Sequence, residues 1–452
     1  MGIREAPFCE EPPSSRSVRG GVEILSGLRA PARSPRAVAR WSGVVIVTAI
    51  FLSSAGCSER TFEPGDTRTG LTALLSGRAW DSLEHSLEWS ETGEATVREI
   101  LTSYLESVCQ FLCAELRTLE RVHQQSVYEA AYLGRVLVGA YEVTLDSRFL
   151  ECASALAADL LEQQRSDGYW IAAEHGSIYL ADLGSLMGFF MSLAGHTTGS
   201  GNSRYLDAVE GFAQTVLSDG MILESGALDV GYLCESGAGC TRLEGPFTIS
   251  TALVGVEVFS WLYSQTGLPL YRDVATDALG WILALQSEDG SFPYILPARG
   301  ADPALGTRDA LHHIWSRRRY TTSTYVGESL MIAYDGLAGE AVERIRAAFR
   351  THVEMLLDTQ RQDGLWGLNW HDRRRCGGCV SLLAWYYREV DQDPRIVRAI
   401  DRFLIGAVQN PPKQLNAWPD IEVDEAREYP DTGAAFVARA VVHLLRPGDG
   451  IP

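Results

Sequence analysis

Residues Gln360–Trp366 read QRQDGLW, and the same Q-x-x-D-G-x-aromatic pattern occurs at Gln164–Trp170 (QRSDGYW) and at Gln286–Phe292 (QSEDGSF). Each copy ends a run whose apolar residues are spaced for one face of a helix. The Asp-Gly pair supplies a left-handed stop after a helix, and the aromatic residue two positions later can pack back onto the helix end. A weaker copy, Ser218–Gly220, ends the run that begins near Asn202. The pattern therefore indicates a chain built from repeated helical units.

Two kinds of run alternate along the chain. The amphipathic runs, with charge on one face, cover about 95–121, 146–164, 202–218, 269–287, 340–361 and 393–409. The other six runs are apolar or small nearly all round and cover about 127–143, 180–196, 247–265, 323–338, 376–389 and 431–446. A helix that is apolar on every side must be buried on every side. The natural closed arrangement is an inner ring of helices wrapped by an outer ring.

We therefore predict an all-α fold, an (α/α)6 toroid of six helical hairpins, in one domain over residues 93–452. The alternative is an open α-solenoid, whose uncapped ends would need shielding that a closed ring makes unnecessary. No stretch shows the sustained alternation or the βαβ rhythm that would argue for a sheet.

Composition limits the classes of function. The chain has 452 residues, 46% hydrophobic and 21% charged, which excludes a fully disordered or multi-spanning membrane protein. Its formal net charge is −19, and Lys413 is its single Lys. Nucleic-acid binding needs a positive surface, so we expect no nucleic-acid partner.

The N-terminal region has the pattern of a targeting signal. Several Arg residues precede the uncharged stretch Trp41–Gly56, which is too short to span a bilayer comfortably as a helix. Small residues directly before Cys57 resemble the bacterial lipoprotein cleavage box, although Ser54 stands where that family usually has Leu. The resemblance implies a signal peptide over 1–56, lipidation of Cys57, a flexible tether over 57–92 and a place in the bacterial cell envelope, anchored to the membrane. An ordinary cleaved signal or an uncleaved anchor remains the alternative.

The body of the chain resembles the six-hairpin (α/α)6 superfamily, which includes glycosidases, polysaccharide lyases and sugar epimerases. Tyr325–Asp335 (YVGESLMIAYD) and Asp363–Asp372 (DGLWGLNWHD) look like its carbohydrate-active branch. The related toroids of terpene cyclases and prenyltransferases carry similar Q-x-x-D-G-x-W motifs, but the acid-rich D-x-D-D motif of the cyclising enzymes is absent from the sequence. Fold does not fix function, so the site needs a separate argument.

In such a toroid, the loops that lead into the inner helices converge on one mouth, where helix N-termini present partial positive charge. Aromatic faces stack on sugar rings and carboxyl groups bond hydroxyls, so aromatics beside acids in these loops favour a sugar site. Trp170 and Trp366 have an alternative role as plugs of their hairpins, and Trp370 and Trp418 are open to both interpretations. The predicted substrate-binding residues are Trp170, His175, His313, Trp315, Arg318, Tyr320, Tyr325, Trp366, Trp370, Arg374, Trp418 and Tyr429.

Two Arg triplets, 317–319 and 373–375, precede adjacent inner helices. If they face the mouth, they would recognise a carboxylate or sulfate, which suggests an acidic sugar such as a uronate. The alternative is that they pair with surface acids.

For acid/base chemistry we predict Asp372 and Glu328, with His371 or His313 as a proton-transfer or orienting partner and Asp182 in reserve. If the reaction is an elimination, Tyr320 or a His would be the base. Any of these acids has the alternative role of a helix cap.

The cysteines suggest disulfides, as export would. We predict a Cys234–Cys240 bridge, and Cys109 or Cys113 could reach Cys152. Cys376 and Cys379 form a C-x-x-C motif that could be a bridge or a redox pair, or with His371 a zinc site. One such motif without a second spaced pair is weak, and we predict no metal and no cofactor.

The leading hypothesis is an exported, lipid-anchored protein that acts on an acidic poly- or oligosaccharide by hydrolysis, lyase chemistry or epimerisation. Two alternatives stay open: a non-catalytic glycan-binding or scaffold lipoprotein, and a toroid that handles terpenoids or lipids in an aromatic cavity with few charges.

Overall fold

A computed structural model describes residues 97–116, 127–171, 177–196, 200–235, 239–295, 319–367, 375–409 and 432–446. The described residues all belong to the unit Ala55–Pro452. The predicted signal peptide, Cys57 and the tether 57–92 lie outside them. Among the helices in the described ranges, none has both the length and the apolar character needed to cross a membrane.

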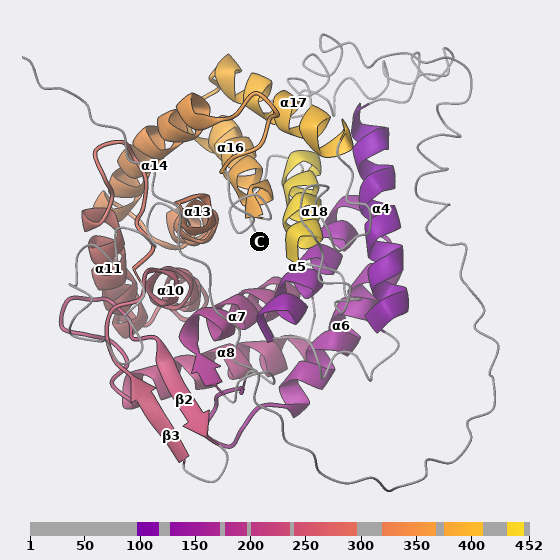
Figure 1. The fold of residues 1–452 in the computed structure, drawn as a ribbon. Coiled ribbons are helices and arrows are strands. Elements are labelled where there is room, and N and C mark those ends of the chain that lie inside the picture. Colours follow the sequence, from indigo (N-terminus) through magenta and orange to yellow (C-terminus); the bar gives the residue numbers. More distant parts are fainter. Residues whose placement is uncertain are drawn as a thin grey trace, which may run out of the picture. The chain divides into compact units, whose positions relative to one another are not determined.

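The helices form two concentric rings (Figure 1). The inner ring contains α5 (Val127–Thr144), α7 (Leu180–Ala194), the continuous segment α9 (Thr248–Ser250), η2 (Thr251–Val258) and α10 (Phe259–Thr266), α13 (Arg319–Gly336), α16 (Gly377–Glu389) and α18 (Thr432–Leu445). The outer ring contains α4 (Val97–Leu116), α6 (Ser147–Glu162), α8 (Ser200–Ser218), α11 (Pro269–Ala284), α14 (Glu340–Thr359) and α17 (Pro394–Gln409). Each inner segment packs against the next, and α18 packs against α5, so the ring is closed. The prediction of an (α/α)6 toroid is confirmed.

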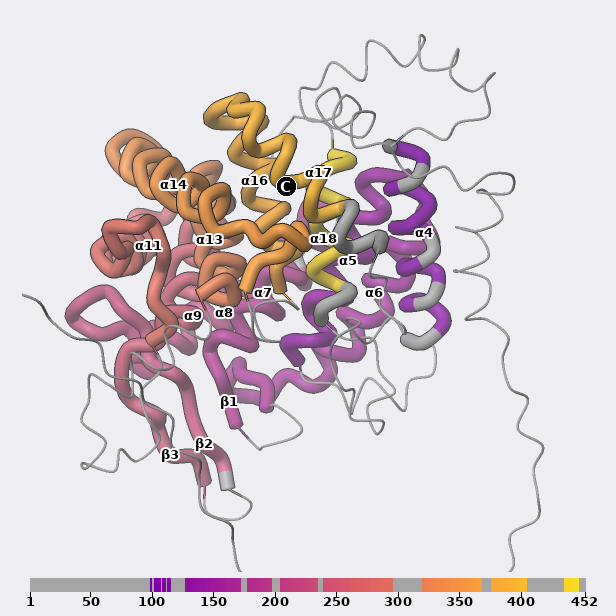
Figure 2. Tube along the Cα trace, turned by 45° about the horizontal axis from the view of Figure 1, so that its top comes forward, coloured from indigo at the N-terminus to yellow at the C-terminus, as the bar shows by residue number. Residues whose placement is uncertain are grey.

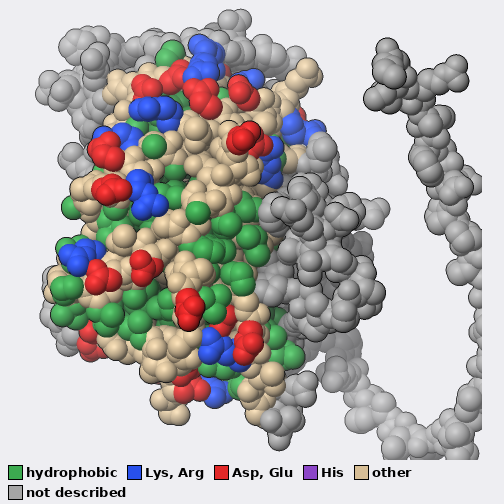
Figure 3. All heavy atoms as spheres, turned by 90° about the vertical axis from the view of Figure 1, so that its left-hand side faces the viewer, with side chains coloured by type: hydrophobic (Ala, Val, Ile, Leu, Met, Phe, Trp, Pro, Cys, Tyr) green, Lys and Arg blue, Asp and Glu red, His purple; other side chains and the backbone are tan. Residues whose placement is uncertain are grey.

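Burial separates the two rings as the sequence pattern predicts. In α7, only Asp182 and Ser192 escape full burial. In α14, by contrast, burial is confined to one stripe that includes Ile345, Phe349 and Val353. The face seen in Figure 3 carries both acidic and basic side chains, interspersed with apolar ones. Because an inner helix is enclosed by neighbours on all sides, its apolar residues need no single face.

Each of the three Q-x-x-D-G-x-aromatic turns follows an outer helix, leads toward the next inner helix and contacts the neighbouring outer helix. In the third copy, Gln360 Nε2 donates to the carbonyl oxygen of Gly364 at 2.8 Å and to that of Ala399, in α17, at 2.7 Å. Gly364 has φ 79°, and a Cβ there would lie 2.0 Å from the carbonyl oxygen of Arg402. The second copy repeats this arrangement, with Gln286 Nε2 bonded to the carbonyl oxygens of Gly290 and Ala348. The turn therefore requires glycine both for its φ and for close contact with the neighbouring helix.

Three short strands form a small sheet that the sequence pattern does not predict. β1 (Ser177–Tyr179), β2 (Gly231–Glu235) and β3 (Gly239–Leu243) pair antiparallel in the order β1-β2-β3. Figure 2 shows them extending from one end of the helical body, and β1 leads directly into α7. Segments of three to five residues are too short to show a period of two, which explains why the strands were missed.

Candidate active site

The N-terminal ends of four inner helices bring together five residues, which we name the mouth cluster: Tyr128 and Glu129 in the first turn of α5, Asp182 in the first turn of α7, Tyr325 in the second turn of α13, and Arg375, which precedes α16. Tyr325 is buried, whereas the other four are only half-buried. The cluster therefore lies at the end of the ring where the inner helices begin, with part of its surface accessible.

Arg375 holds the two tyrosines of the cluster together. Its Nε donates to the hydroxyl of Tyr325 at 2.9 Å, and its Nη2 donates to that of Tyr128 at 3.0 Å. The Tyr325 hydroxyl in turn donates to that of Tyr128 at 2.8 Å. Burial raises the pKa of Tyr325 well above its ordinary value, although Arg375 acts in the opposite direction. The Tyr325 hydroxyl therefore keeps its proton at neutral pH.

Asp182 is the mouth-cluster residue with the clearest acid/base character. Its pKa is raised to about 7, chiefly by burial and then by the negative charge of Glu129, while Arg375 acts in the opposite direction. A half-buried carboxyl that titrates near neutral pH can both donate and accept a proton under physiological conditions. Asp182 was the reserve candidate in the sequence, and its surroundings now make it the leading one.

Glu328 lies deeper, in a group that we name the core quartet: Arg135 of α5, Glu257 of η2, Glu328 of α13 and Arg439 of α18. Glu328 is 2% exposed and lies 3.0 Å from Arg439 and 3.7 Å from Arg135. Tyr132 also donates to it, at 3.1 Å. These are the contacts of a buried ion-pair network, so the structure corrects the prediction of a proton-transfer role for Glu328: it has no accessible side on which to meet a substrate.

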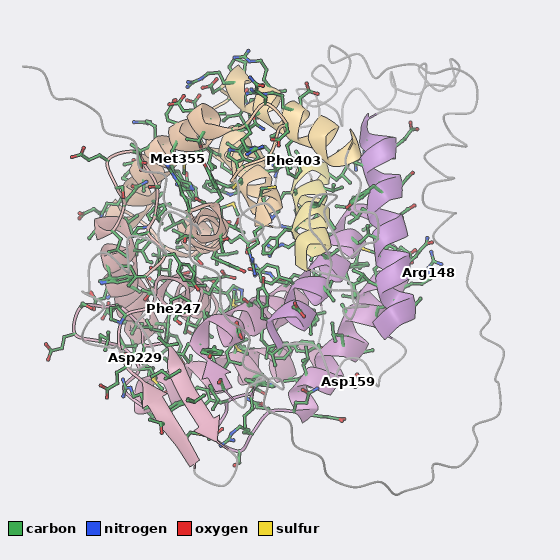
Figure 4. The ribbon with its side chains drawn as sticks, in the orientation of Figure 1. Arg148, Asp159, Asp229, Phe247, Met355 and Phe403 are labelled. Atoms are coloured by element: carbon green, nitrogen blue, oxygen red, sulfur yellow. A yellow bond between two sulfur atoms is a disulfide. The ribbon has the colours of Figure 1, made fainter. Side chains whose placement is uncertain are left out.

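Trp170 and Trp366 serve as plugs. They are 1% and 0% exposed. Trp170 Nε1 donates to the carbonyl oxygen of Leu160 at 2.6 Å, and Trp366 Nε1 donates to that of Leu356 at 2.8 Å. Trp366 also packs near Phe403 of α17, which Figure 4 labels. Both tryptophans are closed in by protein, so the prediction that they contact substrate is wrong and the alternative interpretation holds.

The two Arg triplets behave differently. Arg319, from the first, pairs with Asp289 of the second repeat turn at 2.7 Å and lies beside Tyr320, which is half-buried. Arg375, from the second, faces the mouth cluster. The remaining predicted site residues stay predictions, because they lie outside the described residues: His175, His313, Trp315, Arg318, Trp370, His371, Asp372, Arg374, Trp418 and Tyr429.

Two disulfides join the pairs that the sequence favoured. Cys234 and Cys240 face each other across β2 and β3, and Cys113 of α4 is bonded to Cys152 of α6. Arg242 of β3 pairs with Asp229, which Figure 4 labels and which precedes β2, so the hairpin is also anchored at its base. Cys376 and Cys379 are buried at the start of α16. The bridge, the redox pair and the zinc site stay open as alternatives for this motif beside the prediction of no metal, and His371, which a zinc site would need, lies outside the described residues. Within the described ranges, no group of three His, Cys, Asp or Glu residues could hold a metal ion.

Tyr128 and Glu129 were missed in the sequence. Both lie in the first turn of α5, and residues 117–126 before it contain no Trp, Tyr or Phe and a single acid, Glu120. An available signal was the acid itself, since Glu129 stands in a run that is otherwise nearly all apolar up to Glu142.

No protein-family model matches this sequence, and no curated protein matches it significantly. Among solved structures, a polysaccharide lyase is similar with 16% identity and a TM-score of 0.50, covering 76% of this chain and 97% of the lyase. A sugar epimerase from a ruminal bacterium has 11% identity and a TM-score of 0.52, covering 72% and 89%. A glycosyl hydrolase family 88 protein from Bacteroides vulgatus has 12% identity and a TM-score of 0.51, covering 76% and 99%.

The chain also aligns with ent-copalyl diphosphate synthase from Streptomyces platensis, of which it spans half the length, at 18% identity and a TM-score of 0.45. At such low identities the likeness to the lyase, the epimerase and the hydrolase establishes the (α/α)6 toroid fold and nothing about the reaction.

Proposed function

We propose that this chain is a carbohydrate-active enzyme that acts on an acidic poly- or oligosaccharide, such as one containing uronate, at the mouth cluster. The observation that carries the proposal is Asp182, a half-buried carboxyl with a pKa of about 7 beside a second carboxyl and a guanidinium. Toroids similar in fold include a polysaccharide lyase, a sugar epimerase and a glycosyl hydrolase, so the fold is compatible with such a substrate.

Asp182 fits the step that these reactions share. Hydrolysis needs a proton on the leaving oxygen, whereas elimination and epimerisation need a proton taken from carbon, and each requires a group that titrates near the working pH. In hydrolysis, protonated Asp182 would act as the acid while Glu129 or the predicted Asp372 serves as the second carboxyl. In elimination or epimerisation, ionised Asp182 would act as the base.

Arg375 supports an acidic substrate. Its planar guanidinium suits a carboxylate, and the hydroxyl of half-buried Tyr128 beside it can bond a sugar hydroxyl. A terpenoid-handling cavity would be lined by aromatics with few charges, whereas the mouth cluster contains two acids and an arginine. That contrast favours the saccharide. A glycan-binding scaffold without catalysis would use the same contacts, so turnover must decide between the two.

The proposed place of action is the bacterial cell envelope, with the mature chain exported and held by lipid on Cys57. The two disulfides favour an oxidising compartment. Mass spectrometry of the membrane fraction would show diacylglycerol on Cys57, and Cys57→Ser should release the protein from that fraction.

The enzymatic proposal is tested by screening the chain that starts after Cys57 against uronate-containing and neutral glycans, and by measuring new reducing ends, ultraviolet absorbance of unsaturated products, and epimer ratios. Asp182→Asn should lower kcat at least about 100-fold, as expected for loss of a general acid or base. The matched control is Asp207→Asn, an exposed acid on outer helix α8. If the wild type binds glycans without turnover, and Asp182→Asn binds them equally well, the result would instead support a non-catalytic glycan-binding scaffold.

A further inference from the structure

The first turn of α7, which holds Asp182, is attached to the small sheet through its own main chain. β1 ends at Tyr179, so the strand runs into the helix without a loop between them. The backbone N–H of Leu180, the first residue of the helix, donates to the carbonyl oxygen of Val230 at 2.9 Å. The first N–H groups of a helix have no partner within it, so this bond fixes the start of α7 to the segment that precedes β2.

The packing on both sides of this attachment is close. Gly231 of β2 has φ 135°, and a Cβ there would lie 1.9 Å from the carbonyl oxygen of Ile178 in β1. On another side, α7 packs so closely against η2 that a Cβ at Gly184 would lie 2.7 Å from the Cβ of Leu253. A shift of residues 229–231 would therefore displace the first turn of α7, while the following turn is held by η2.

Asp229 anchors the segment that receives the bond from α7. Its side chain is 0% exposed and lies where the small sheet meets the helical body (Figure 4). Asp229 Oδ2 accepts from Arg242 Nε at 2.7 Å, and its Oδ1 accepts from the backbone N–H of Gly245 at 2.7 Å. Because both carboxylate oxygens are bonded, the place of Asp229 is determined by β3 and by the loop that leads into α9.

Arg242 connects this anchor to the outer ring. Its Nη2 donates to the carbonyl oxygen of Gly220 at 2.7 Å, and its Nη1 donates to that of Asp219 at 3.1 Å. Both carbonyls belong to the weaker copy of the repeat turn, Ser218–Gly220, which follows α8. Tyr232 of β2 also donates to Asp219 Oδ2, at 2.8 Å. One planar guanidinium therefore fixes a buried carboxylate relative to an outer-helix turn.

We propose that Arg242 and Asp229 are positioning residues for Asp182. They fix the pairing of β1 with β2, and through it the first turn of α7. The inference rests on the proposed function, because it deepens the role given there to Asp182. Without this anchor the first turn of α7 is free to move toward solvent, which removes part of the burial that raises the pKa of Asp182. Glu129 and Arg375, the charged groups that act on the carboxyl from other elements, stay where they are.

The test measures the titration of Asp182 in an Arg242→Gln chain by two routes. In urea titrations, Asp182→Asn should stabilise the Arg242→Gln chain at about pH 8, relative to about pH 5, clearly less than it stabilises the wild type. In catalysis, the limb of the pH–rate profile that belongs to Asp182 should move about one pH unit lower, and kcat should fall about tenfold with a smaller change in KM.

The matched control removes a different cross-link from the same hairpin. Cys234→Ser together with Cys240→Ser opens the disulfide, which lies beyond Leu233, the last residue of β2 that pairs with β1. This double variant should lose stability but keep the pH dependence of Asp182. Arg242→Lys is the test variant if Arg242→Gln does not fold, because it keeps a cation beside the buried carboxylate. One ammonium cannot bond the carboxylate and both carbonyls, so the change should be smaller and in the same direction.

A folded Arg242→Gln or Arg242→Lys chain with the pH dependence of the wild type would overturn the proposal and leave Arg242 a structural residue of the hairpin. An equal change in the double serine variant would overturn it as well. The urea titrations need no substrate, so they separate this inference from the proposed function. A reduced pH dependence in a chain that turns over no glycan would support the positioning role and overturn only the proposed function.

Discussion

The hydroxyl of Tyr325 donates to the hydroxyl of Tyr128 at 2.8 Å, across 197 positions of the chain. Arg375 donates to both hydroxyls from the start of a third inner helix, so α5, α13 and α16 are joined at one point near the mouth. This contact depends on closure of the ring, because the first inner helix meets the fourth only if the ring's interior is narrow. The same closure places Asp182 where Glu129 and Arg375 act on its pKa.

Arg375→Lys should lower the free energy of unfolding by about 2 kcal/mol, because one ammonium cannot reproduce the fork that bonds two hydroxyls. Urea unfolding monitored by circular dichroism measures the change. Arg319→Lys is the matched control, since Arg319 forms a partly exposed pair with Asp289 and its replacement should cost less than about 1 kcal/mol. Equal losses in the two variants would contradict the positioning role given to Arg375.

Asp182 should make the folded chain less stable as pH rises. Its pKa is about 7 when folded and 3.8 in the ordinary state, so between these values the folded chain holds a proton that the unfolded chain has released. Stability is therefore lost from about pH 4 to pH 7, by up to about 4 kcal/mol. Asp182→Asn removes this dependence.

Urea titrations at about pH 5 and pH 8 check that prediction. The Asp182→Asn variant should gain stability over the wild type at the higher pH and much less at the lower one. Asp207→Asn, on the exposed face of α8, should show no such difference. A gain for Asp182→Asn that is the same at both values would mean that its carboxyl titrates normally.

The fold could be read from the sequence because both of its determinants are local. The burial of α7 on all sides follows from its apolar composition. Each repeat turn is marked in the sequence by an Asp-Gly pair whose glycine must take a positive φ, as Gly290 does with 86°. The sequence shows no comparable pattern for the hairpin of β2 and β3. Its two strands are held together by the Cys234–Cys240 bridge and by Arg242 rather than by a pattern of apolar residues.

The site was less predictable because its chemistry depends on which distant side chains meet. Nothing near Glu328 in the sequence reveals that Tyr132, Arg135 and Arg439 surround it. Likewise, Asp182 differs from an acid that caps a helix through its burial and its three-dimensional neighbours Glu129 and Arg375, which together set its pKa. The order of helices in the sequence predicted where the mouth lies. Which carboxyl there has a pKa near neutrality depends on the packing of the closed ring.

Gly364→Ala should destabilise the chain by more than about 2 kcal/mol, because the methyl group meets the carbonyl oxygen of Arg402 in addition to straining a positive φ. Gly339→Ala offers a close control: Gly339 has φ 66°, but a Cβ there meets nothing within 4 Å. It should therefore cost only the strain, about 1 kcal/mol. The difference between the two urea midpoints isolates the contact between the repeat turn and α17, and no difference would show that the turn can move away from the helix.

Trp366→Phe distinguishes a plug from a sugar platform. The indole of Trp366 is fully buried and its Nε1 donates to the carbonyl oxygen of Leu356, so the smaller ring loses a hydrogen bond and leaves a cavity. We expect a loss of about 2–4 kcal/mol in the free energy of unfolding, with the Kd for any saccharide ligand unchanged in calorimetric titration. Trp281→Phe, at a half-buried position on outer helix α11, should cost clearly less stability and also leave the Kd unchanged. If Trp366→Phe instead weakened saccharide binding and left the free energy of unfolding unchanged, the indole would have to contact the substrate. The role of Trp366 as a buried plug would then be wrong.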